Sequence, residues 1–106
     1  MSNRVSIKGV KVSTDHYING KWLSSKKKFT VINPNNPTEV LAEVSRGDEE
    51  IAKLAISAAR EGFNIWSEMS VDDRSSVMHK LADLIERNVE DISLIECLDM
   101  GMRHES

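Results

Sequence analysis

Long apolar runs and cysteines are both scarce in this 106-residue sequence. No apolar run exceeds three consecutive residues, as at positions 40–42, which excludes a membrane-spanning segment. The first fifteen residues contain no continuous apolar stretch, so they do not resemble a secretory signal. The single cysteine, Cys97, excludes an internal disulfide and, in the absence of a signal, indicates a cytoplasmic location.

A strong charge of one sign is also lacking. The formal net charge of −3 is too small to attract a nucleic acid or a membrane over a long range. No basic stripe with interleaved aromatic residues is present, so neither partner is expected. With 40% hydrophobic and 29% charged residues, the composition is that of a globular protein. Aromatic residues make up only 5%, so any core must be built from aliphatic side chains and methionine.

The first half of the chain predicts short strands. Residues 1–15 show no sustained period and are predicted to form a mobile N-terminal arm or an edge segment. Asn19 and Gly20 then supply the positive φ angles of a type I′ turn, which predicts a first hairpin over residues 16–23. A second hairpin is predicted to pair residues 29–32 with 39–44. Its connection over residues 33–37 should lie outside the sheet, because its two prolines cannot donate ladder hydrogen bonds.

A lysine-rich loop over residues 24–28 separates the two predicted hairpins. Two interpretations of this loop stay open at the level of the sequence. Its cations either form an anion-binding patch or belong to a solvated turn.

The second half predicts three helices. Asp48 is a suitable N-cap for a helix whose apolar residues recur at helical spacing up to Trp66. A second helix is predicted to open at Ser70 and to break at Asn88, where a third, short helix begins. Gly101 fits the left-handed residue that closes such a helix. The predicted order is therefore two β-hairpins followed by three helices.

Residues with catalytic potential are few and scattered. Cys97 lies near the C-terminal end of a predicted helix, where the helix dipole disfavours a thiolate, so a structural role is predicted. His16, His79 and His104 have no metal-ligand spacing with one another or with Cys97. No G-x-G-x-x-G, P-loop or G-x-S-x-G motif occurs. By themselves, these residues predict no catalytic site.

Four stretches nevertheless resemble, in order and spacing, the opening segment of aldehyde dehydrogenases. They are YINGKW at 17–22, FTVINP at 29–34 with EVLAEV at 39–44, AAREGF at 58–63 followed by Trp66, and LADLIERN at 81–88 leading to LIECLDMG at 94–101. The sequence departs from the family pattern in three places. Met102 and Arg103 stand where the family has Lys-Pro, and Pro37 begins a dipeptide that replaces a Thr-Gly turn. Cys97 occupies a Thr-like position, so it does not match the family's nucleophile.

The resemblance implies an α/β fold in which residues 16–106 form the outer part of a Rossmann-like nucleotide-binding domain and oligomerisation region. It implies an NAD(P)-dependent enzyme that oxidises an aldehyde to a carboxylate through a cysteine thiohemiacetal. The residues for that chemistry lie downstream of this sequence in the family, so the chain by itself is expected to be inactive. Its expected partners are the remainder of its own chain, further subunits of a homo-oligomer, and an aldehyde substrate.

The same resemblance leads to one further expectation, and two alternatives stay open. The resemblance implies a monovalent cation, Na⁺ or K⁺, held by the backbone carbonyls of Val31 and Ile32 and the carboxylate of Asp99. The alternative for Asp99 is a cap or a salt bridge near a helix end. The alternative for the whole chain is a non-catalytic interaction or oligomerisation module derived from the same fold.

Overall fold

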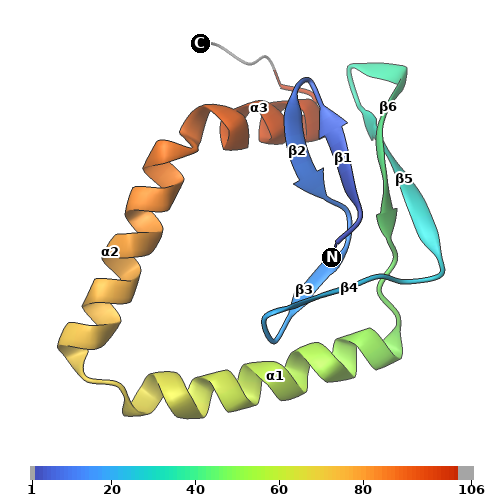
Figure 1. Ribbon diagram of the computed structural model, residues 1–106. Coiled ribbons are helices and arrows are strands. Elements are labelled where there is room, and N and C mark those ends of the chain that lie inside the picture. Colours follow the sequence, from blue (N-terminus) through green and yellow to red (C-terminus); the bar gives the residue numbers. More distant parts are fainter. Residues whose placement is uncertain (1, 103–106) are drawn as a thin grey trace.

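The computed structural model describes residues 2–102, and it contains three β-hairpins followed by three helices (Figure 1). The strands are β1 (Arg4–Ile7), β2 (Val10–Ser13), β3 (His16–Ile18), β4 (Lys21–Leu23), β5 (Lys28–Asn33) and β6 (Asn36–Ser45). The helices are α1 (Glu49–Glu68), α2 (Val71–Arg87) and α3 (Val89–Met100). Within the described residues each strand pairs only with its hairpin partner, always antiparallel.

The helix boundaries confirm the capping residues that the sequence predicted. The side chain of Asp48 accepts a hydrogen bond from the Ile51 amide at 2.9 Å and begins α1. Ser70 caps α2 in the same way, accepting from the Asp73 amide at 3.1 Å. Asn88 separates α2 from α3, and Gly101 closes α3 with a φ of 75°. These short polar and glycine residues satisfy backbone groups that the helices leave unpaired at their ends.

The first predicted hairpin is confirmed as β3–β4, with Asn19 at φ 51° and Gly20 at φ 73°. The hairpin β1–β2 was not predicted from the sequence. It turns through Lys8 and Gly9, whose φ angles are 51° and 86°. Lysine rarely adopts a positive φ, so within the turn itself only the glycine indicates it. The mobility of residues 1–15 stays a prediction.

The second predicted hairpin is present as β5–β6, but its connection is shorter than expected. Only Pro34 and Asn35 lie between the strands, because Asn33 pairs with Asn36. Pro37 therefore lies inside β6, contrary to the prediction. The ladder shifts register between Val31 and Ile32 and again between Ile32 and Asn33. Such an irregularity accommodates a proline, which cannot donate a ladder hydrogen bond.

A polar junction joins the three hairpins. The Thr14 amide donates to Asn3 O at 3.0 Å, and the Ser45 amide donates to Thr14 O at 2.9 Å. The Ser45 hydroxyl donates to Asp15 Oδ1 at 3.2 Å and accepts from Lys28 Nζ at 2.9 Å. Thr14 and Ser45 are the only buried side chains among residues 2–102. The hairpins are therefore held together here by hydrogen bonds rather than by an apolar core.

The helices run along three sides of an open frame whose remaining side is closed by the hairpins (Figure 1). The radius of gyration is 16.6 Å, whereas a compact domain of about 100 residues has a value of about 13 Å. No apolar side chain of the described residues is fully buried; Phe63 is 65% and Leu84 51% exposed. No helix in this part of the chain is long and apolar enough to cross a membrane.

Candidate functional site

A hollow lies between the hairpins and the end of the helical run. It has a volume of about 900 Å³ and is lined by β1, β2, β5, β6, the end of α2 and the inner face of α3. Its lining is mainly aliphatic and includes Val12, Leu41 and Ile95. Acidic residues of α3, among them Asp91 and Asp99, also line it. The hollow therefore combines an apolar interior with acidic groups contributed by one helix.

The structure brings two of the three predicted cation-binding residues to this hollow. Val31 of β5 and Asp99 of α3 both line it, whereas Ile32 does not. Asp99 is exposed and lies in the last turn of α3. The register shift between Val31 and Ile32 falls at the pair whose carbonyls are the predicted ligands. A bulge of this kind takes backbone groups out of the regular ladder.

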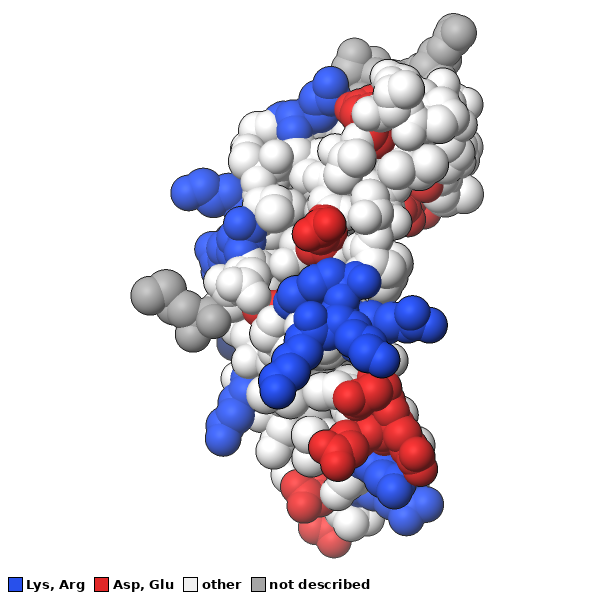
Figure 2. Space-filling model, turned by 90° about the vertical axis from the view of Figure 1, so that its right-hand side faces the viewer, with Lys and Arg blue, Asp and Glu red and all other residues white. Residues whose placement is uncertain are grey.

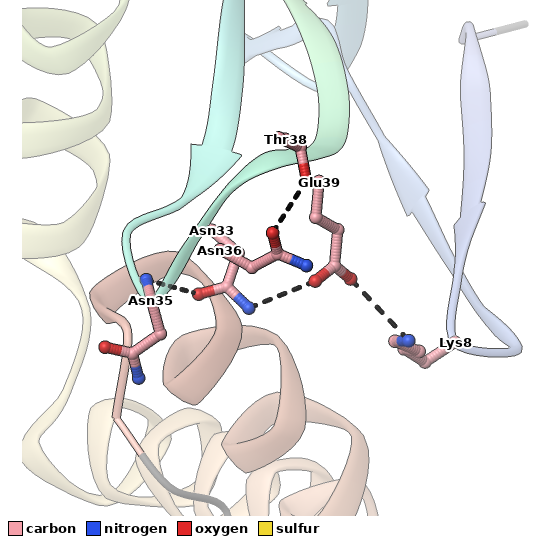
Figure 3. A network of polar contacts seen from close by, with 6 residues as sticks. All are labelled: Lys8, Asn33, Asn35, Asn36, Thr38 and Glu39. Carbon is pink, nitrogen blue, oxygen red and sulfur yellow. Dashed lines mark hydrogen bonds and ion pairs between the residues drawn. The ribbon is translucent and has the colours of Figure 1, made fainter.

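Beside these residues, a network of polar contacts fixes the tip of the β5–β6 hairpin (Figure 3). Glu39 accepts a hydrogen bond from Asn33 Nδ2 at 3.2 Å and forms an ion pair with Lys8 at 3.6 Å. Asn33 Oδ1 in turn accepts from the Asn35 amide at 3.0 Å. The side-chain amide of Asn35 donates to the carbonyl of Gly101, at the end of α3. The network thus connects the tip of β1–β2, the tip of β5–β6 and the C-terminus of α3.

Close packing and a φ of 75° both favour glycine at position 101. A Cβ atom at Gly101 would lie 3.0 Å from Pro34 Cβ and 3.4 Å from the Asn35 nitrogen. The Gly101 cap was predicted from the sequence, but the network was not, because Lys8 and Gly101 are distant in sequence from the turn that they contact. The only signal was the density of asparagines between Asn33 and Asn36, which marks a turn but not its tertiary partner.

The other candidates for chemistry remain separate in space. Cys97 is half-buried on α3, near the helix C-terminus, as predicted, and its carbonyl accepts from the Met102 amide at 2.8 Å. His16 lies on β3, where its Nε2 is 2.8 Å from Ser25 Oγ, and His79 lies on α2. His104 lies outside the described residues. Within residues 2–102 no three His, Cys, Asp or Glu side chains are grouped to hold a metal ion.

The lysine-rich loop is part of a mixed surface rather than a purely basic one. Figure 2 shows a group of Lys and Arg side chains with Asp and Glu side chains next to it. Lys26, Lys27 and Arg46 line a shallow hollow together with Asp48 and Glu50, which balance much of their charge. Lys28 is turned to Ser24 and Ser45, to which its ammonium group donates at 2.7 and 2.9 Å. This arrangement favours the solvated turn over the anion patch.

Comparison with known sequences identifies the family. The sequence profile of the aldehyde dehydrogenase family matches residues 22–106. The chain is 36% identical over 88 residues to 5-carboxymethyl-2-hydroxymuconate semialdehyde dehydrogenase of Escherichia coli, covering 83% of this chain and 19% of that protein. It is 40% identical over 89 residues to betaine aldehyde dehydrogenase of Bacillus subtilis, covering 80% and 18%. The chain thus spans less than a fifth of the length of these relatives.

Solved structures have the same arrangement of hairpins and helices. A variant of betaine aldehyde dehydrogenase from Staphylococcus aureus, in complex with NAD⁺, matches with a TM-score of 0.77 and 38% identity over 84% of this chain and 18% of that chain. Aldehyde dehydrogenase from Bacillus cereus matches with a TM-score of 0.74 and 38% identity over 81% and 18%. The structure is accordingly a partial α/β domain of β-hairpins followed by three helices. Profile, relatives and fold agree, and the chain belongs to the aldehyde dehydrogenase family.

Proposed function

We propose that this chain serves as the outer strands and first helices of the nucleotide-binding region of an NAD(P)-dependent aldehyde dehydrogenase. The reaction is the oxidation of an aldehyde to a carboxylate, and its catalytic residues are carried by sequence other than these 106 residues. The partners of the chain are the remainder of such an enzyme and further subunits of a homo-oligomer. The cytoplasmic location inferred from the single cysteine stays a prediction.

The observation that carries this proposal is the open frame. Apolar residues recur at helical spacing on α1 and α2, and α3 is apolar without a distinct polar face, yet no apolar side chain of the three helices is fully buried among the described residues. Amphipathic helices are stabilised mainly by burying their apolar face against another element. Helices whose apolar residues are left uncovered are therefore expected to pack against additional protein. The matched relatives contain such additional protein, since they are roughly five times as long as this chain.

The sequence and the described residues offer no feature typical of a dinucleotide site. A phosphate-binding turn needs glycines that allow the backbone to approach the pyrophosphate at a helix N-terminus. The five glycines of this chain are widely separated, and the N-termini of α1 and α2 are occupied by the side chains of Asp48 and Ser70. We therefore assign no contact with NAD or NADP to this segment, whose contribution to cofactor binding is structural support.

A monovalent cation site at Val31, Ile32 and Asp99 is the second part of the proposal. Backbone carbonyls with a single carboxylate form a hard, oxygen-only ligand set of low charge, which suits Na⁺ or K⁺ better than zinc. The shared hollow of Val31 and Asp99 and the bulge at Val31–Ile32 support this assignment. Bound there, the ion would hold β5 against the end of α3, and further ligands would come from the remainder of the enzyme.

A segment exchange tests the main proposal. Residues of this chain replace the matched segment of the Bacillus subtilis betaine aldehyde dehydrogenase, and the hybrid is assayed for folding, NAD⁺ binding and aldehyde oxidation. We expect a folded hybrid that retains activity, because the exchanged part supplies scaffold and not chemistry. A hybrid in which lysine replaces Leu81 and Ile85 should fail to fold, because the two charges would lie where α2 is expected to contact the remainder of the enzyme through apolar side chains. A folded hybrid that binds NAD⁺ but requires Cys97 for turnover would refute the proposal.

The chain by itself is expected to oxidise no aldehyde. The assay follows reduced-nicotinamide absorbance with NAD or NADP and a panel of aliphatic, aromatic and semialdehyde substrates. Cys97→Ser is the matched control, because it removes the only thiol of the sequence. Turnover that disappears in Cys97→Ser would show that the chain is a cysteine enzyme in its own right.

A further inference from the structure

The turn of the β3–β4 hairpin carries the chain's one asparagine that is followed by glycine. Asn19 and Gly20 are both exposed and form the turn, with φ angles of 51° and 73°. The Gly20 amide makes none of the backbone hydrogen bonds of the described turns and loops. A Cβ atom at Gly20 would meet nothing within 4 Å. The residue that follows Asn19 is therefore both sterically small and open to solvent.

We infer that Asn19 is a deamidation site whose reaction is controlled by the opening of the β3–β4 hairpin. The Gly20 backbone nitrogen loses its proton and attacks Cγ of Asn19. A bond forms between these two atoms, the bond from Cγ to Nδ2 breaks, and the side-chain nitrogen leaves as ammonia. Water then opens the resulting succinimide at either carbonyl, which yields aspartate or isoaspartate. Glycine favours the attack because it carries no side chain to hinder the approach.

The closed hairpin opposes this reaction. Both φ angles of a type I′ turn are positive and fixed by the pairing of Ile18 with Lys21. Ring closure requires rotation about the Cα–C bond of Asn19, which takes the residue out of the turn. The reaction rate is therefore proportional to the fraction of molecules in which the hairpin is open.

The structure indicates that this opening costs little. The strands β3 and β4 have three residues each and pair with no third strand within the described residues. The two strands share the ring pair of Tyr17 and Trp22, 4.7 Å apart, whose members are 62% and 42% exposed, and the hairpin is attached to its surroundings mainly at its base, where His16 Nε2 lies 2.8 Å from Ser25 Oγ. A two-stranded hairpin of this kind is only marginally stable in water.

The isoaspartate product would change the hairpin permanently. Its backbone contains one additional methylene group, so the two-residue turn no longer matches the register of Ile18 with Lys21. The new carboxylate also adds a negative charge at the tip. We expect the ring contact of Tyr17 with Trp22 to be lost, while α2 and α3, which lie elsewhere in the frame, are unaffected (Figure 1).

The test compares the unmodified chain in mildly alkaline buffer with the same chain in concentrated urea. Peptide mapping by mass spectrometry locates deamidation, and an isoaspartyl methyltransferase detects the isoaspartate product. We expect Asn19 to react before every other asparagine, at a rate within about tenfold of that in urea, because the hairpin is marginal. Tryptophan fluorescence should change in step with the product.

Asn19→Gly is the matched variant, since Gly-Gly also forms a type I′ turn but has no side chain to cyclise. It should show no modification at this peptide and keep its fluorescence. Asn64, which precedes Ile65 within α1, serves as the internal reference for a slow site. The inference is overturned if Asn64 reacts as fast as Asn19, or if the native chain reacts more than about tenfold slower at Asn19 than in urea.

Discussion

Asp15 is the residue that ties the N-terminal segment to the third hairpin. Its carboxylate accepts from the Asn3 amide at 2.8 Å, from Asn3 Nδ2 at 3.3 Å and from the Ser45 hydroxyl at 3.2 Å. The backbone hydrogen bond from Asn3 is the main reason that the pKa of Asp15 lies below its ordinary value of 3.8, and the side-chain hydrogen bonds act in the same direction. The ionised form is therefore the one that holds the junction together.

This lowered pKa predicts an acid-sensitive junction. A carboxylate with a depressed pKa stabilises the folded state above its unfolded pKa, and this contribution is lost as the pH falls through the folded pKa. In an NMR titration, the Asn3 amide resonance should therefore shift with a midpoint below 3.8. Asp15→Asn should abolish the transition. A midpoint at or above the ordinary value would contradict the hydrogen-bonding geometry.

Asp99 provides a prediction about ions. In the hybrid enzyme, Asp99→Ala should remove any increase in melting temperature caused by K⁺ or Na⁺ and leave aldehyde oxidation in place, because no catalytic role falls to this residue. Asp91→Ala is the matched control, since Asp91 is also an exposed acid of α3 that lines the same hollow. Equal cation dependence in the parent hybrid and in Asp99→Ala would exclude the site.

At the level of elements, local chemistry made most of the structure predictable. The caps at Asp48 and Ser70 and the Asn19-Gly20 turn depend on backbone groups only a few residues away, and all were predicted correctly. The hairpin β1–β2 was missed because its turn uses Lys8, a residue without a left-handed preference. The alternating valines and isoleucine around that turn were the signal that would have revealed it.

Contacts between elements were harder to predict than the elements themselves. The prediction for Val31, Ile32 and Asp99 came from family resemblance, since nothing local relates β5 to α3. The network of Lys8, Glu39 and Asn33 was not predicted at all. Side-chain hydrogen bonds between distant segments leave no periodic pattern in a sequence, so only the folded chain reveals them.

The N-cap of α2 predicts a measurable effect on helix stability. Ser70→Ala removes the hydrogen bond to the Asp73 amide and should destabilise the start of α2 by about 1 kcal/mol. Backbone chemical shifts of residues 71–74 and far-ultraviolet circular dichroism would report this fraying. Ser75→Ala is the matched control: Ser75 is an exposed residue inside α2, where alanine raises helix propensity. Fraying of similar size in both variants would show that the cap has no special role.

For the whole molecule, the decisive feature is the amount of apolar surface that the helices leave exposed. The exposed fractions of Leu54, Leu81 and Ile85 are 52%, 48% and 48%, although all three lie on the apolar faces of amphipathic helices. The two buried side chains of the described residues are polar. Hydrogen bonds at the hairpin junction therefore organise one side of the molecule, whereas hydrophobic burial, which normally dominates folding, is largely missing.

This imbalance predicts that the isolated chain associates with itself or binds hydrophobic dye. Monomers rarely expose a contiguous apolar patch larger than about 300–600 Å², and α1 and α2 present many large aliphatic and aromatic groups to solvent. Light scattering at increasing protein concentration and the fluorescence of an anilinonaphthalene dye would measure the two effects. Replacing Leu81 and Ile85 by lysine should reduce both self-association and dye binding.

Replacing the exposed Ser75 and Ser76 of the same helix by lysine is the matched control. It adds equal charge without removing apolar surface, and should leave dye binding unchanged. A concentration-independent monomer with a sharp melt and no dye signal would show instead that the hairpins and helices are stable without a partner, and the open frame would then need another explanation.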